Sequence, residues 1–189
     1  MRAALPDRNV KTRMRGQSAR LLHVSTSAGN RSRGHLRSGH AVLPVALGRA
    51  GTRANKREGD GSTPRGRFRL VRLWWRADRL PRPSTGLPVR RIYDNDAWCE
   101  DPQDRRYNRA IKLSPSSDGD RLKRGDHLYD LVIELDHNTR PRVRNLGSAV
   151  FIHVAHPGFA PTAGCVALDP QSLRRLLPRL SGRTLIDIR

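Results

Sequence analysis

The chain has 189 residues, enough for one domain with a sizeable core, and 36% of them are hydrophobic, as in a soluble globular protein. None of its apolar windows approaches the roughly 18 residues that span a bilayer, so no transmembrane segment is expected. The net charge of +20 raises the hypothesis of nucleic-acid binding. Because the excess is spread along the chain and no aromatic-interleaved basic helix is present, no nucleic-acid partner is expected.

Residues 1–19 are basic and lack periodic apolar positions, so we expect a poorly structured N-terminus followed by one domain over 20–189. The first 30 residues contain no apolar run of the roughly 7 to 15 residues found in signal peptides. No export signal is therefore recognised, and a wrongly assigned start codon is the alternative explanation.

Two apolar runs near the start of the domain predict strands, at residues 20–24 and 41–47. Pro44 in the second run suits an edge strand or a bulge, because proline cannot donate to a sheet. The intervening residues 25–39 are rich in Ser, Gly and Arg, and we expect them to form a turn.

Residues 48–66 show no periodicity and include a Gly/Asp/Pro-rich part typical of a tightly wound loop. We expect this loop at the edge of a groove, with Arg49 or Lys56 held against Asp60. An ordinary tight turn is the alternative. A phosphate cradle is not expected, because no Gly-Lys-Ser/Thr sequence follows.

Alternation of apolar and basic residues at 68–74 predicts a half-buried strand. The Pro-rich residues 77–117 are expected to be irregular, with their aromatic residues and Asn favouring order. Residues 128–135 are the clearest strand of the chain.

The C-terminal part predicts further strands at 149–154, 165–168 and 184–188. Between the last two, a helix should open with Asp169 as its N-cap and Pro170 as its first residue. Four leucines at helical spacing should lie in the core: Leu173, Leu176, Leu177 and Leu180. The chain is thus β-rich, with little helix and no internal repeat.

A His and a Cys lie on neighbouring predicted strands, on either side of a Gly/Pro-rich turn: His153 and Cys165. A thiol with a pKa near 8.5 reacts as its thiolate, so a His that takes its proton makes the pair a candidate for covalent catalysis. A core Cys beside an ordinary sheet His is the alternative.

A zinc site is a further alternative, built from His153, His156 and Cys165 with His127 or His137 as the fourth ligand. The spacing fits no common zinc signature. Positions 153 and 156 would also point to opposite faces of an extended strand, so no metal and no cofactor is expected.

The second cysteine, Cys99, either pairs with Cys165 in an oxidising compartment or stays free in a reducing one. We interpret it as a small buried core residue, because packing anchors are scarce in its polar, turn-rich surroundings.

These features resemble the L,D-transpeptidase catalytic domain, the YkuD-like family of cell-wall enzymes. That family has a His on one strand, a loop, and then Ser/Thr-His-Gly-Cys, which His153 and Thr162-Ala163-Gly164-Cys165 follow in order. The loop is short and Ala163 stands where the motif usually has a second His, as in a branch with a Thr-x-Gly-Cys motif. Further similar segments span residues 21–189: 47–49, 56–64, 66–68, 98–101, 107–109 and 126–130.

The resemblance implies a mainly β fold, a β-sandwich with one or two short helices and long loops. It also implies an acyltransferase of peptidoglycan synthesis, turnover and cell shape, with stem peptides as partners. Cys165 would attack the third stem-peptide residue, the terminal D-amino acid would leave, and an amine would then attack the thioester with His153 as its base.

Other residues take supporting roles in this interpretation. The backbone N–H groups of Gly164 and Cys165 are candidates for the oxyanion donors, and Thr162 should support the turn with its hydroxyl. His156 is a candidate substitute for the missing motif His. The resemblance places a possible substrate groove at His156, Trp98, Tyr107 and Asn108.

The acceptor stays open between another stem, a protein, a D-amino acid and water, the last of which would make a carboxypeptidase. A non-catalytic wall-binding module is the other alternative, because the second motif His is missing. The family implies a periplasmic or cell-wall location, and the oligomeric state is not predicted.

Overall fold

The structure is a computed structural model that describes residues 18–114 and 120–189. The predicted N-terminal segment therefore lies almost entirely outside the described residues. The fold is mainly β, as predicted. Its described residues contain one α-helix, α1 (Pro170–Leu176), and two short 3₁₀ turns, η1 (Pro157–Phe159) and η2 (Leu177–Arg179). No helix in the described residues has the length and apolar content needed to cross a membrane.

Nine strands form the main sheet: β1 (Leu21–Ser27), β2 (Asn30–Ser38), β3 (Ala41–Ala46), β6 (Gly66–Trp75), β7 (Val89–Arg91), β11 (Leu131–Leu135), β12 (Phe151–Val154), β13 (Val166–Leu168) and β14 (Leu185–Ile188). Their order is β11-β12-β13-β3-β2-β1-β14-β6-β7. Because β6 also pairs with β11, eight of these strands close into a ring and β7 extends it at one edge. The predicted β-sandwich-like fold is confirmed as a β-rich sheet that closes into a barrel-like form.

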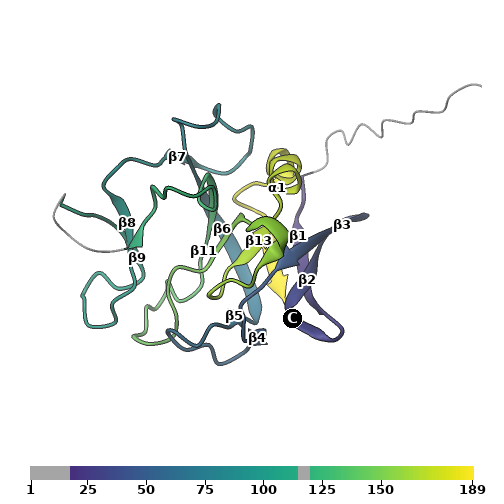
Figure 1. Cartoon of the computed structure of the whole chain (residues 1–189), viewed down its shortest axis with the longest axis horizontal. Coiled ribbons are helices and arrows are strands. Elements are labelled where there is room, and N and C mark those ends of the chain that lie inside the picture. Colours follow the sequence, from purple (N-terminus) through teal and green to yellow (C-terminus); the bar gives the residue numbers. More distant parts are fainter. Residues whose placement is uncertain (1–17, 115–119) are drawn as a thin grey trace, which may run out of the picture.

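Two small sheets complete the fold. One contains β8 (Asp96–Cys99), β9 (Arg109–Lys112) and β10 (Asp120–Arg121), and the other pairs β4 (Thr52–Arg53) with β5 (Thr63–Pro64). Figure 1 shows β8 and β9 at one end of the molecule, and β1, β2 and β3 at the other. The irregular residues 77–117 thus contain β7, β8 and β9.

Residues 25–39 are not the predicted turn but the end of β1 and the whole of β2, in register with each other as a hairpin. Along β2, Gly34, Leu36 and Ser38 are buried while the residues between them are exposed. The inward positions thus alternate as in any half-buried strand, but two of the three side chains are small or polar. The turn itself is short and contains Gly29, whose φ is +76°.

The C-terminal helix agrees with the prediction. Asp169 accepts hydrogen bonds from the backbone N–H groups of Gln171 and Ser172, and Pro170 is its first residue. The four predicted core leucines are all buried: Leu173, Leu176, Leu177 and Leu180. They join the main hydrophobic core with side chains from β1, β2, β6 and β11.

A second apolar cluster positions the site. The cluster lies between two parts of the fold: the small sheet that contains β8, and the strands β6, β11 and β12 of the main sheet. Its members include Trp74, Trp98, Val132, Phe151 and Cys165. Cys99 is buried and free, which fits its interpretation as a core residue and excludes a disulfide with Cys165 in this structure.

Candidate active site

Cys165 immediately precedes β13, which runs parallel to β12 with Val166 opposite Ile152. Its side chain is only 8% exposed. Sγ accepts a hydrogen bond from the Phe151 N–H at 3.4 Å and donates one to the Ala149 carbonyl at 3.2 Å. Two backbone groups, one in β12 and one just before it, therefore fix the position of the thiol.

The Ala149 backbone is held in turn by Asn108, which is buried with a φ of +53°. Asn108 Oδ1 accepts hydrogen bonds from Ala149 N at 3.2 Å and from Trp98 Nε1 at 3.1 Å. Its Nδ2 donates to the carbonyls of His137 and Asn138. Asn108 thus joins three segments beneath the nucleophile.

The predicted groove role of Trp98, Tyr107 and Asn108 is corrected by these contacts. All three side chains are at most 4% exposed, and none lines a cavity at Cys165. Tyr107 donates its hydroxyl hydrogen to Glu58. The polar atoms of these buried side chains form hydrogen bonds inside the protein. The three residues therefore support the backbone around Cys165 and do not line its cavities.

His153 lies in β12, between Val132 of β11 and Ala167 of β13. Its Nδ1 donates to the carbonyl of Val154 at 2.8 Å, which leaves Nε2 as the basic nitrogen. The Tyr129 ring packs edge-on against the imidazole with centroids 5.4 Å apart. The ring is therefore held in one orientation.

Burial keeps both partners neutral. It lowers the pKa of His153 to about 4, against the opposing effect of the hydrogen bond to Val154, and raises the pKa of the Cys165 thiol to about 12. In the described part of the chain, the hydrogen bonds of Sγ go to Ala149 and Phe151, not to His153. The resting site is thus a protonated thiol near a neutral imidazole, without the thiolate that a charged His would favour.

The turn before Cys165 is organised by Thr162. Its hydroxyl donates to the Cys165 carbonyl at 2.8 Å and accepts from the Gly164 N–H at 3.1 Å. The Gly164 N–H is therefore occupied, which leaves the Cys165 N–H as the oxyanion candidate of the predicted two. Gly164 has a φ of +151° and lies so close to Ser62 that a Cβ would be 2.7 Å from the Ser62 carbonyl oxygen.

The 48–66 loop approaches Cys165 through Lys56. Lys56 is 5% exposed, and its Nζ donates to Asp60 Oδ1 at 3.0 Å and to the Arg57 carbonyl at 3.3 Å. The predicted ion pair with Asp60 is thus confirmed for Lys56. A Cβ at Gly164 would lie 3.3 Å from Nζ, so the ammonium group sits directly beside the turn that carries the nucleophile.

Two cavities meet at Cys165. The first, about 190 Å³, is lined by residues that include His153, His156 and Arg124. The second, about 180 Å³, is lined by residues that include Lys56, Glu58, Glu100 and Arg49. Tyr129, Ala163 and Cys165 line both.

The expectation that positions 153 and 156 face apart is wrong for their side chains at the cavity. β12 ends at Val154 and the chain turns into η1, so the alternation of an extended strand no longer applies at His156. His156 therefore lines the same cavity as His153, although it is exposed.

The sequence did not single out Arg124, Tyr129 or Glu100, which come from segments far from Cys165 in the chain. Partial burial in its cavity, with the negative charges of Asp120 and Glu58, raises the pKa of Glu100 to about 7. The sequence signal for Tyr129 and Glu100 was the similarity of residues 126–130 and 98–101 to the family. That similarity did not indicate the role of each side chain.

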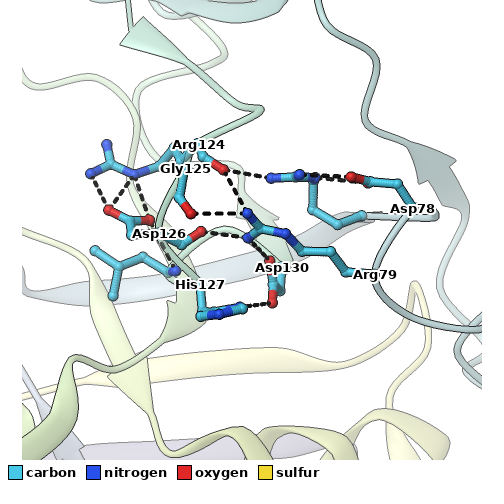
Figure 2. A network of polar contacts seen from close by, with 9 residues as sticks. Asp78, Arg79, Arg124, Gly125, Asp126, His127 and Asp130 are labelled. Atoms are coloured by element: carbon cyan, nitrogen blue, oxygen red, sulfur yellow. Dashed lines mark hydrogen bonds and ion pairs between the residues drawn. The ribbon is translucent and has the colours of Figure 1, made fainter.

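A network of arginines holds the loop that carries Arg124 and Tyr129 (Figure 2). Arg79 donates to the carbonyls of Gly125 at 2.9 Å and Asp126 at 2.6 Å, and to the Asp130 carboxylate at 2.7 Å. Arg124 forms a two-pronged ion pair with Asp126. The loop is thus fixed from the end of β6, which keeps Tyr129 against the imidazole.

The zinc hypothesis lacks a ligand set. His127 bonds to Asp130, and His137 bonds to the Leu146 carbonyl. Within residues 18–114 and 120–189, no group of three or more His, Cys, Asp or Glu side chains is arranged to hold a metal ion.

Comparison with known proteins identifies a family. A family model, the L,D-transpeptidase catalytic domain (YkuD), matches residues 19–188. No curated protein and no solved structure matches the chain. Since the match covers nearly all of the described residues, the chain belongs to the L,D-transpeptidase catalytic domain family, whose enzymes act on peptidoglycan peptides.

Proposed function

We propose that the protein is a peptidoglycan L,D-transpeptidase that uses Cys165 as its nucleophile and His153 as its base. The observation that carries the proposal is the position of Cys165 where the two cavities meet, with His153 in the wall of one of them. A nucleophile between two cavities can accept an acyl group from one side and exchange amines on the other. The proposed substrate places the protein in the periplasm or at the cell wall.

In the first half-reaction, Sγ attacks the carbonyl carbon of the third stem-peptide residue and its proton passes to His153 Nε2. The C–N bond to the terminal D-amino acid then breaks, and His153 returns the proton to the leaving amine. The Cys165 N–H is the proposed donor to the oxyanion. Because the pKa of the thiol is raised, proton transfer must accompany attack or closely precede it.

In the second half-reaction, an amine attacks the thioester and loses its proton to the same imidazole, and the thiol is restored. Both amines must pass within reach of His153, so we assign them to the cavity with His153. The carboxylate of the leaving D-amino acid would then lie toward the guanidinium group of Arg124, which lines this cavity together with His156. The acyl part of the stem is assigned to the cavity with Lys56.

Lys56 supplies positive charge beside the turn in which the motif His is missing. Its ammonium group lies beside Gly164 and favours the thiolate of Cys165, while Glu100 and Asp120 oppose it. Asp60 holds the ammonium group in position.

Changing Lys56 to Met is expected to raise the pKa of the Cys165 thiol further and to slow its labelling at a given pH, since a cation beside the turn that carries the thiol is lost. The measurement is the rate of iodoacetamide labelling as a function of pH. Arg53→Gln removes the same charge from an exposed position in β4 and should leave the profile unchanged. A profile that does not move in Lys56→Met would refute the electrostatic role.

The decisive experiment is incubation with disaccharide-tetrapeptides, followed by mass spectrometry, beside a Cys165→Ala protein. Loss of the terminal D-alanine together with dimers joined through third residues is expected for the wild type only. Loss without dimers would favour the carboxypeptidase alternative. Identical, unchanged substrate in both proteins would contradict catalysis and favour the non-catalytic wall-binding module.

A further inference from the structure

A groove of about 490 Å³ lies on the outside of the barrel, between β6, β11 and the loop that follows β11. Four arginines line it: Arg69, Arg72, Arg140 and Arg142. It shares no lining residue with either cavity at Cys165. The groove is therefore a separate feature, and the reaction proposed above makes no use of it.

The carboxylates in the groove are already engaged. Asp136 Oδ1 accepts from the backbone N–H of Arg69 at 2.7 Å. Glu134 Oε2 accepts from Trp74 Nε1 at 3.1 Å and lies 3.1 Å from Arg72 Nε, and burial raises the pKa of this carboxyl group. The groove thus sets two carboxylates against four guanidinium groups, and one of the two is paired with Arg72.

Positive charge remains uncompensated along the groove. Among the residues that the structure describes, the guanidinium groups of Arg69 and Arg140 have no hydrogen-bond or ion-pair partner. Burial and the like charges of Arg109 and Arg140 lower the pKa of Arg142. Such a cluster is stabilised by an anionic ligand, and the planar guanidinium fork matches the geometry of a carboxylate.

The groove is connected to the nucleophile through Asn108. Arg142 Nε donates to the Asn108 carbonyl at 3.1 Å, and Asn108 Oδ1 accepts from Ala149, whose carbonyl receives the Cys165 S–H. The ligand that suits this cluster of guanidinium groups is a polymer that presents several carboxylates. Peptidoglycan is such a polymer, and its stem peptides carry free carboxylates.

We propose that the arginine groove binds the carboxylates of a second stem peptide, outside the stem that reacts at Cys165. This inference rests on the proposed function, because peptidoglycan is the ligand in both. It adds a holding site that would raise the affinity of the protein for intact wall without changing the chemistry at Cys165.

The test is co-sedimentation with purified peptidoglycan sacculi, carried out on Cys165→Ala protein so that binding is measured without turnover. The double variant Arg69→Gln/Arg140→Gln is expected to bind about tenfold more weakly. Its control, Arg20→Gln/Arg37→Gln, removes the same charge from exposed positions next to and within β1–β2 and should change binding less than twofold. Equal losses in both double variants, or no loss in either, would overturn the groove assignment.

Two further measurements separate the causes of failure. In protein with Cys165 intact, the groove variant should process soluble tetrapeptides at the wild-type rate and sacculi more slowly. If no variant shows turnover but the binding difference persists, the groove stands and the proposed reaction fails. Soluble stem tripeptide should displace the protein from sacculi better than inorganic phosphate at equal ionic strength, and the reverse order would overturn the carboxylate assignment.

Discussion

Replacing His153 with Asn is expected to slow acyl-enzyme formation about 1000-fold while the protein stays folded. The Asn side-chain amide can occupy the position of Nδ1 and keep the hydrogen bond to the Val154 carbonyl, which is 2.8 Å long in the structure. It has no atom in place of Nε2, so the proton acceptor for Cys165 is lost. The rate of release of the terminal D-alanine from tetrapeptide measures the effect.

The same variant reports the protonation state of the buried ring. At pH 7 the imidazole is neutral in both folded and unfolded chains. Below a pH of about 6.5 the unfolded chain binds a proton, whereas the folded chain does so only near pH 4, where the pKa of His153 lies. The free energy of unfolding should therefore fall as the pH drops through this window, by about 3 kcal/mol in total.

Urea unfolding at pH 7, 5.5 and 4.5 measures how the free energy of unfolding depends on pH. This dependence should be weaker in His153→Asn than in the wild type. His137 has a lowered pKa for the same reason, burial, and it is present in both proteins, so its contribution cancels in the comparison. Parallel curves would mean that folding leaves the pKa of His153 unchanged, which would contradict the lowered pKa of the buried ring. An unchanged reaction rate would mean that another group, of which His156 is the nearest candidate, accepts the proton.

Parts of the fold that depend on local sequence were predictable. The helix at 170–176 begins with an Asp cap and a Pro, and both act within one turn of their own position. The strand at 68–74 shows its alternation directly. By contrast, β2 was missed because its inward positions hold Gly34 and Ser38, which carry no apolar signal.

The candidate site, like the fold, was predictable only where it depends on local sequence. The order of His153 and Cys165 along the chain was readable, because both lie on strand-like apolar runs joined by one turn. The sequence placed Lys56 in a groove-edge loop but did not place it beside Cys165, and it did not single out Arg124 or Tyr129, since each of the three reaches the site from another loop. Nor could composition show that Asn108 would be buried, because the four hydrogen bonds of its side chain come from tertiary structure.

Changing Gly164 to Ala is expected to cost about 3 kcal/mol of stability and to lower the rate of acyl-enzyme formation at least 100-fold. Its φ of +151° is strained for any residue with a side chain. The added Cβ would also lie 2.7 Å from the Ser62 carbonyl oxygen, a backbone atom that cannot move aside without shifting the loop that holds Lys56. Either adjustment displaces Cys165 from its two backbone partners.

The variant Gly158→Ala separates the backbone strain of a positive φ from the close approach to Ser62. Gly158 also has a positive φ, +71°, but no atom beyond its chain neighbours lies within 4 Å of the position of a Cβ. Gly158→Ala should therefore lose only about 1 kcal/mol of stability, from conformational strain, and the rate of acyl-enzyme formation should change little. Urea unfolding and tetrapeptide turnover of both variants check the comparison. If Gly164→Ala were no worse than Gly158→Ala, the close approach to Ser62 would not constrain the nucleophile, and the turn could accept the side chains that its geometry excludes.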